Sequence, residues 1–341
     1  MIRVEYTLNN RKLESAYVKL FPYPDMQKQW RALQKKYVTV FGTASFPTVL
    51  QLLKAPIEKL VDTFFLFTEK IDAAKAAGII DKDSKKALID ELFVIFNYDK
   101  KGGYRDKIAA FMMEESNLFK IHTCHYCDMA YVNYFKTSSG KKIRQFDVEH
   151  ILDKGNCPLV ALSLYNFLPS CQPCNRTIKG SNCAGETKSS SRTGRLKEIV
   201  KKLSPTNPNY DFDGNMSFYI KPKDPLNTSF ENLLAHEEDF ELDIHTDGDA
   251  DYQFEVEQFH LKERYNSHRS EAFFLKDKLD HYPKSKIEEI ARLAKTTPEV
   301  VANDLFGIDF HVEHHRTFSK LYRDIFSYYN KTLVSTKNGR V

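Results

Sequence analysis

Apolar residues recur every three to four positions through much of residues 26–120, which predicts a largely helical region. The clearest case begins at Pro56, because proline suits the first turn of a helix. Its apolar face consists of Ile57, Leu60, Val61, Phe64, Phe67 and Ile71. The same spacing predicts helices over 84–97 and 104–118. We interpret these aromatic-rich faces as core packing, the usual role of such side chains.

Strict alternation of apolar and polar residues appears in shorter runs and predicts strands. Runs at 3–8 and 15–20 predict a β-hairpin at the start of the chain, and residues 216–221 predict another strand. Runs at 240–244 and 252–256 flank the dipeptide at 247–248, which is Asp-Gly, so they predict a second hairpin.

The last 85 or so residues return to helical spacing, with helices expected over 258–279, 287–294, 298–305 and 311–329. His311, His314 and His315 then lie on one helix face. No cysteine or acidic cluster accompanies them, so we favour a surface or capping role over a metal site.

The centre of the chain combines strands with helices. A strand is expected over 143–151 after a turn at 140–142, a short apolar run occupies 164–168, and a helix follows the cysteine at 174. The predicted class is therefore α+β. We expect a β-hairpin and helical domain at 1–120, a central core at 121–203, and an acidic hairpin with helices at 204–341.

Two identical CxxC spacings frame this central core, formed by Cys124 with Cys127 and Cys171 with Cys174. Each CxxC turn lets two thiolates reach one tetrahedral ion, and two turns complete a closed four-thiolate shell. A pair of such motifs predicts a structural Zn²⁺ site. The 43 residues between the two motifs exceed a usual zinc-ribbon gap and predict a functional insertion.

Charge is distributed unevenly along the chain, although the formal net charge is only +4. Residues 136–202 hold 13 Lys/Arg and 5 Asp/Glu, whereas residues 224–280 hold 5 and 16. A positive region around the central core suits a phosphate-binding surface. The basic helix expected over 192–203 could follow a nucleic-acid backbone, and a solvated face explains it equally well.

Other classes of protein are disfavoured by composition. There is no apolar run of about 18 residues and no charged-then-apolar amino terminus, so neither a membrane span nor a secretory signal is expected. Four of the six cysteines are paired as CxxC, which suits a reducing cytoplasm better than a disulfide scaffold. We therefore expect a cytoplasmic protein.

Inside the insertion stand Asp-Val-Glu-His at 147–150, an asparagine at 166, and Cys-Asn-x-x-x-Lys at 174–179. With the paired cysteines, in this order, the segment from 124 to 180 resembles the HNH, or His-Me finger, endonucleases, whose core is a ββα-metal unit. The resemblance implies that His150 is the general base and that Asn166 fixes the loop orienting it. It also implies that Glu149 and Asn175 ligate Mg²⁺ or Mn²⁺, with Asp147 as an alternative ligand.

These residue types suit hydrolysis of a phosphodiester. A histidine titrates near neutrality and can accept a proton from water, and Mg²⁺ prefers oxygen ligands while keeping several waters. The resemblance implies DNA as substrate. The residues expected to contact nucleic acid are Arg176, Lys179, Lys141, Lys142, Arg192 and Arg195.

A wider resemblance joins the helical amino-terminal region, the Cys-His-Tyr-Cys motif, the Asp-Val-Glu-His strand and a helical tail containing Asn-Ser-His-Arg at 266–269. Together these are similar to bacterial antiphage-defence HNH proteins, such as the Septu-type HNH subunit. That likeness implies an ATPase or other defence subunit as partner, with the acidic carboxy-terminal half as its docking surface. The alternative is a non-catalytic, zinc-dependent nucleic-acid-binding or scaffold subunit.

Overall fold

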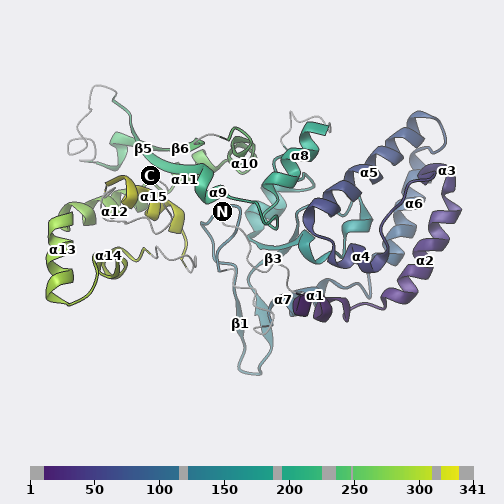
Figure 1. Ribbon diagram of the computed structural model, residues 1–341, viewed down its shortest axis with the longest axis horizontal. Helices are drawn as coiled ribbons and strands as arrows, with labels where there is room; N and C mark the ends of the chain where they lie inside the picture. The colour runs from purple at the N-terminus through teal and green to yellow at the C-terminus, as the bar shows by residue number, and fades with distance from the viewer. Residues whose placement is uncertain are drawn as a thin grey trace. The chain divides into compact units, whose positions relative to one another are not determined.

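The computed structural model describes residues 11–114, 122–186, 194–224, 236–246, 249–308 and 316–329. These residues form helices and three small antiparallel sheets of two strands each, so the class is α+β as predicted (Figure 1). Contacts divide the chain into two compact units. One holds described residues of 2–126 and 131–211, and the other those of 127–130 and 212–341.

The first unit opens with helices that pack around aromatic rings. They are α1 (Arg11–Val18), α2 (Tyr23–Lys36), α3 (Val38–Phe41), α4 (Val49–Lys54), α5 (Ile57–Ala76), α6 (Lys82–Ile95) and α7 (Arg105–Met112). The helix predicted after Pro56 is confirmed as α5, and its whole predicted apolar face is buried. Trp30 is fully buried, with the rings of Phe41, Phe46 and Phe96 about it.

The hairpin predicted at the start of the chain is wrong where the structure describes it. Its second half, 15–20, lies in α1 and the turn after it, while 3–8 falls outside the described residues. Leu13 and Tyr17 are both buried in α1. They stand four positions apart on one helix face, so burying both outweighs the local alternation.

Three strand pairs carry the remaining sheet structure. β1 (Tyr134–Lys136) pairs with β2 (Lys142–Arg144), and β3 (Asp147–His150) pairs with β4 (Phe167–Ser170). The strand predicted over 143–151 is therefore two strands in two different sheets. The break falls at Gln145 and Phe146, where the chain leaves its first partner and the ring of Phe146 is buried.

In the second unit, β5 (Met216–Pro222) confirms the predicted strand and pairs with β6 (Phe240–Thr246) along seven residues. The predicted hairpin partner of β6 is wrong, because 252–256 lies in the helix α10 (Tyr252–Gln258). Tyr252, Glu255 and Val256 are buried there at helical spacing. The dipeptide at 247–248 lies outside the described residues.

The carboxy-terminal helices match the predicted periodicity, although their bounds differ from the predicted ones. They are α11 (Leu261–Asn266), α12 (Arg269–His281), α13 (Lys284–Leu293), α14 (Pro298–Phe306) and α15 (Ser319–Tyr329). The single helix expected over 258–279 is interrupted twice, at His260, which has φ of +48°, and at Ser267–His268. The three histidines at 311, 314 and 315 lie outside the described residues.

The rest of the first unit is built from short segments. After β3 come η3 (Pro158–Val160) and η4 (Leu164–Asn166), and after β4 comes η5 (Pro173–Lys179), a π-helical segment. α8 (Gly194–Leu203) packs on α5, where Lys197 and Lys201 pair with Asp62 at 2.8 and 3.0 Å. No helix among the described residues is long and apolar enough to span a membrane.

Candidate functional site

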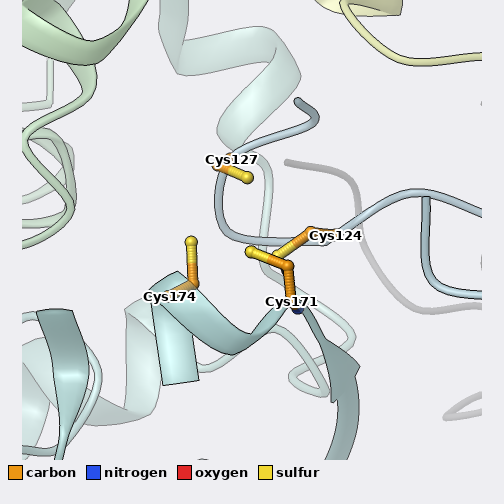
Figure 2. Close-up of side chains that lie close together, drawn as sticks. All are labelled: Cys124, Cys127, Cys171 and Cys174. Carbon is orange, nitrogen blue, oxygen red and sulfur yellow. The ribbon is translucent and has the colours of Figure 1, made fainter. Parts of the chain in front are cut away.

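The four cysteines of the paired motifs meet, as their spacing predicts. Their sulfur atoms all lie within 4.8 Å of one another, and all four residues are buried. Figure 2 shows the side chains turned toward one another, two from the loop before β1, one after β4 and one in η5. The backbone N–H of Cys171 donates to the sulfur of Cys124 at 3.4 Å.

This cluster has the chemistry of a structural zinc site. Four sulfurs at about 2.3 Å from one ion would lie roughly 3.8 Å apart, within the separation that the cluster allows. A four-thiolate shell leaves no position for a substrate. In the described part of the chain it is the only group of three or more His, Cys, Asp or Glu residues placed to share an ion.

Beside the cluster, the chain runs strand, loop, strand and helical segment in the order β3, η3–η4, β4, η5. β3 and β4 are antiparallel, with Glu149 opposite Leu168 and His150 opposite Phe167. η5 begins two residues after Cys171 and is followed by Gly180, whose φ of +55° a residue with a side chain rarely adopts. All the predicted catalytic residues lie on this segment.

His150 is held by the backbone of the loop between the two strands. Its Nε2 lies 3.1 Å from the carbonyl oxygen of Ala161. A carbonyl only accepts hydrogen bonds, so Nε2 carries the proton and Nδ1 keeps its lone pair. The rings of Tyr98 and Phe167 stand 4.4 and 4.8 Å away, centroid to centroid. Burial lowers the pKa of His150 to about 3, so the ring is neutral at pH 7.

Asn166 fixes the loop that holds His150. Its side-chain oxygen accepts from the N–H of Leu152 at 2.7 Å, and its amide donates to the carbonyls of Leu152 and Val160 at 3.1 and 2.9 Å. The side chain is fully buried. Since Val160 directly precedes Ala161, Asn166 indirectly positions the carbonyl that orients the imidazole.

Glu149 and Lys179 form a buried ion pair, with Nζ 2.6 Å from Oε1. Burial raises the pKa of the Glu149 carboxyl, and the Lys179 ammonium opposes that rise. Lys179 also donates to the carbonyl of His150 at 2.8 Å. The sequence predicts a phosphate contact for Lys179. That prediction does not match the structure, because the ammonium is enclosed and satisfied inside the protein.

Asp147 lies at the other end of β3 and joins Asn175 and Arg176. The Asn175 amide donates to Asp147 Oδ2 at 3.2 Å, and the guanidinium of Arg176 donates to both carboxylate oxygens at 2.7 and 2.8 Å. This guanidinium holds the pKa of Asp147 below its usual range. The asparagine expected to share a cation with Glu149 therefore lies against Asp147.

Alternation along β3 divides these side chains between two faces. Asp147 and Glu149 share one face, on which the η5 side chains meet them, and His150 lies on the opposite face. The oxygen-rich group therefore has the hard donors that Mg²⁺ prefers. Within it, Glu149 is paired with Lys179 in the interior, whereas Asp147 is paired with Arg176 and contacts the Asn175 amide nearer the surface.

The expected nucleic-acid contacts differ in their surroundings. Lys141 is exposed at the β1–β2 turn, and Arg195 is exposed near the start of α8. Lys142 donates to the carbonyl of Met113 at 2.8 Å and pairs with Glu114 at 3.2 Å, so it anchors β2 to the end of α7. Arg176 is exposed while bound to Asp147, and the arginine at 192 lies outside the described residues.

Two further groups at the site, Tyr98 and the Ala161 carbonyl, could not be identified from the sequence. Tyr98 packs against His150 from the segment after α6, and its hydroxyl faces the Val148 carbonyl at 3.5 Å. No motif marks either residue, since one acts through its ring and the other through its backbone. Comparison with family models, curated proteins and solved structures found no match, so interpretation of the site depends on its chemistry.

Proposed function

We propose that this protein is a metal-dependent endonuclease of the HNH class that hydrolyses DNA phosphodiester bonds. The observation that carries the proposal is the fixed tautomer of His150, which the Ala161 carbonyl sets and Asn166 stabilises through the loop. A histidine that is only a core residue does not need its Nδ1 lone pair kept available. The strand, loop, strand and helix order around it supports the same class.

In the proposed reaction, Nδ1 of His150 accepts a proton from a water molecule as the water oxygen attacks phosphorus. The entering water and the anionic phosphate must offset the burial that lowers the pKa of the ring. The bond from phosphorus to the 3′ oxygen breaks, and the leaving oxygen takes a proton from solvent water, which leaves a 5′-phosphate and a 3′-hydroxyl. The Ala161 carbonyl holds Nε2–H throughout and stabilises the imidazolium that forms. Because the ring is only 8% exposed, Tyr98 and Phe167 must admit the attacking water.

A hydrated Mg²⁺ or Mn²⁺ would supply positive charge on the scissile phosphate and the leaving oxygen. The oxygen donors available on the η5 side are Asp147, Glu149 and the side-chain oxygen of Asn175. Asp147 and Asn175 are already in contact nearer the surface, so they are the simplest pair to hold the ion once Arg176 releases the Asp147 carboxylate. Use of Glu149 would require Lys179 to leave the carboxylate.

The wider resemblance extends this proposal to antiphage defence, in which an ATPase or other subunit would control the nuclease. The segment 224–280 holds 16 Asp/Glu against 5 Lys/Arg, a charge balance that suits docking of a basic partner.

The direct test is cleavage of supercoiled plasmid with Mg²⁺ or Mn²⁺ by the wild type and by His150→Ala. Removing a general base should lower the rate by about 10²- to 10⁴-fold. His281→Ala is the matched control, since His281 is exposed on α12. Cleavage that persists in His150→Ala, with zinc content unchanged, would refute the role of this residue.

A second candidate function is a non-catalytic nucleic-acid-binding subunit. The observation in its favour is the closed state of the site, in which Lys179 neutralises Glu149 and His150 is almost enclosed. A protein of this kind would bind DNA yet give no cleavage with either metal, and His150→Ala would change nothing. Binding and cleavage measured on the same preparation separate the two functions.

A further inference from the structure

The β1–β2 ribbon, defined here as residues 133–145, carries no buried residue. Its turn is closed by a bond from the Gly140 N–H to the Thr137 carbonyl at 2.9 Å, and Gly140 has φ of +81°. Buried Val132 and Phe146 flank its two ends. An isolated two-stranded ribbon is only marginally stable in water. Because the side chains of this ribbon do not pack into the core, a role other than core packing must account for it.

The register divides the ribbon into two faces. Phe135 lies opposite Ile143, and Asn133 lies opposite Gln145, whose N–H donates to the Asn133 carbonyl at 2.8 Å. All four of these side chains are uncharged and exposed, and Phe135 and Ile143 are 47% and 37% exposed. We name this the amide–apolar face.

The opposite face is basic and is partly fixed. It contains the cross-strand pairs Tyr134 with Arg144 and Lys136 with Lys142. Lys142 bonds to the end of α7, which holds this face toward the helix and leaves the amide–apolar face open. The whole ribbon holds four Lys or Arg residues and no Asp or Glu.

We propose that the β1–β2 ribbon is the duplex-DNA contact of this protein, with its amide–apolar face against base edges in the major groove. This inference rests on the proposed function for its substrate class and adds the surface that would bind it. The major groove admits a two-stranded ribbon. Asparagine and glutamine recognise adenine there, and apolar side chains contact the thymine methyl group.

Charge and chain continuity favour this occupant over a protein partner. Lys136 and Lys141 flank the turn in exposed positions, where their ammonium groups can reach the phosphates beside a groove. Arg144 precedes Asp147 by three residues, so the ribbon leads directly into the candidate site. DNA held by the ribbon is thereby held next to β3.

The test measures binding of a fluorescent duplex of about 20 base pairs by His150→Ala protein, which separates binding from cleavage. Phe135→Ser combined with Ile143→Ser should weaken binding about tenfold, since base contacts of this kind contribute on that scale. Lys141→Gln should weaken it less and should lower the salt slope by about 1. Matched controls are Val94→Ser and Lys86→Gln on α6, both exposed and outside the ribbon.

Duplex binding equal to that of the parent in both ribbon variants would overturn the proposal, as would no duplex binding by the parent at low salt. A loss seen only with single-stranded DNA of the same sequence would also overturn it. Plasmid cleavage by the protein with native His150 is measured in parallel. Absence of cleavage together with ribbon-dependent binding would remove the nuclease proposal and leave this one standing.

Discussion

The cysteine cluster and the polar group along β3 lie in the same stretch of chain, yet their geometry follows from the sequence to different degrees. In the cluster, each CxxC turn fixes the positions of two sulfur atoms locally. A single long-range contact, between the two turns, then completes the four-sulfur arrangement. The side chains of the polar group come from a strand, a loop and η5. Its arrangement depends on strand alternation and on which neighbour each side chain meets.

Residue type can therefore indicate a site without indicating which neighbours its side chains contact. Glu149 and Asp147 are both carboxylates on one face of β3. The first is buried against Lys179, and the second is bound by Arg176 near the surface. Two side chains of the same chemistry therefore have pKa values shifted in opposite directions.

The largest effect is expected in the cysteine cluster. Cys174→Ser removes one thiolate of four, and loss of a structural metal belongs to the few changes that cost more than about 4 kcal/mol. Elemental analysis should show zinc falling from about one equivalent per chain to well below half, with a clear drop in Tm. The control is Cys157→Ala, because Cys157 is equally buried but lies outside the cluster. Equal zinc in both variants would contradict a four-cysteine site.

Within the polar group, Lys179→Met should destabilise the protein by about 3–5 kcal/mol, because it leaves Glu149 buried without a counter-charge. Urea unfolding measures the loss. The double variant Lys179→Met with Glu149→Leu should recover most of it, since the pair is then replaced by apolar groups. If the double variant is no more stable than the single one, the two residues are not coupled as the structure indicates.

Asn166→Ala should cost somewhat less, about 2–4 kcal/mol, by leaving buried backbone groups of Leu152 and Val160 without partners. Asn166→Asp is the informative comparison, because it keeps the acceptor for the Leu152 N–H and loses both donors. At pH 7 we expect it to be less stable than Asn166→Ala, because a buried carboxylate would face the carbonyl oxygens of Leu152 and Val160 without a counter-charge. Urea unfolding of both variants at pH 7 measures the two losses.

The smallest effect is expected at the exposed end of the site. Arg176→Gln should raise the pKa of Asp147 toward its ordinary value near 3.8, because the guanidinium that favours the charged form is lost. In the wild type the depressed pKa contributes stability above pH 3.8, and this contribution disappears as the pH falls through the lower, folded pKa. Carboxyl NMR titration of metal-free protein measures the shift, and an unchanged Asp147 pKa would exclude the pair in solution.

The regular helices could be predicted because their periodicity is long. α5 is an example, with one apolar face over five turns that no strand could bury. Short alternating runs were less informative. The runs at 15–20 and 252–256 fit a strand, yet both are helical because Tyr17 and Tyr252 reach the core at helical spacing.

For the candidate site, spacing and residue type predicted the meeting of the four cysteines and a strand, loop, strand and helix order. They did not predict that Asn175 would meet Asp147, or that Lys179 would be enclosed. Both outcomes depend on how η5 lies over β3, and nothing in the local sequence encodes that. Tyr98 enters from 50 residues before Val148, so only the tertiary structure could identify it.

The two CxxC motifs have a further consequence for biosynthesis. Asp147, Glu149, His150 and Asn166 all lie between Cys127 and Cys171, so an ion bound by the four cysteines would close a chain loop around them. Such a loop can close only after the ribosome has added Cys174. Closing this loop with a bound ion lowers the conformational entropy of the unfolded chain. The availability of metal to the nascent chain would then decide whether this segment matures.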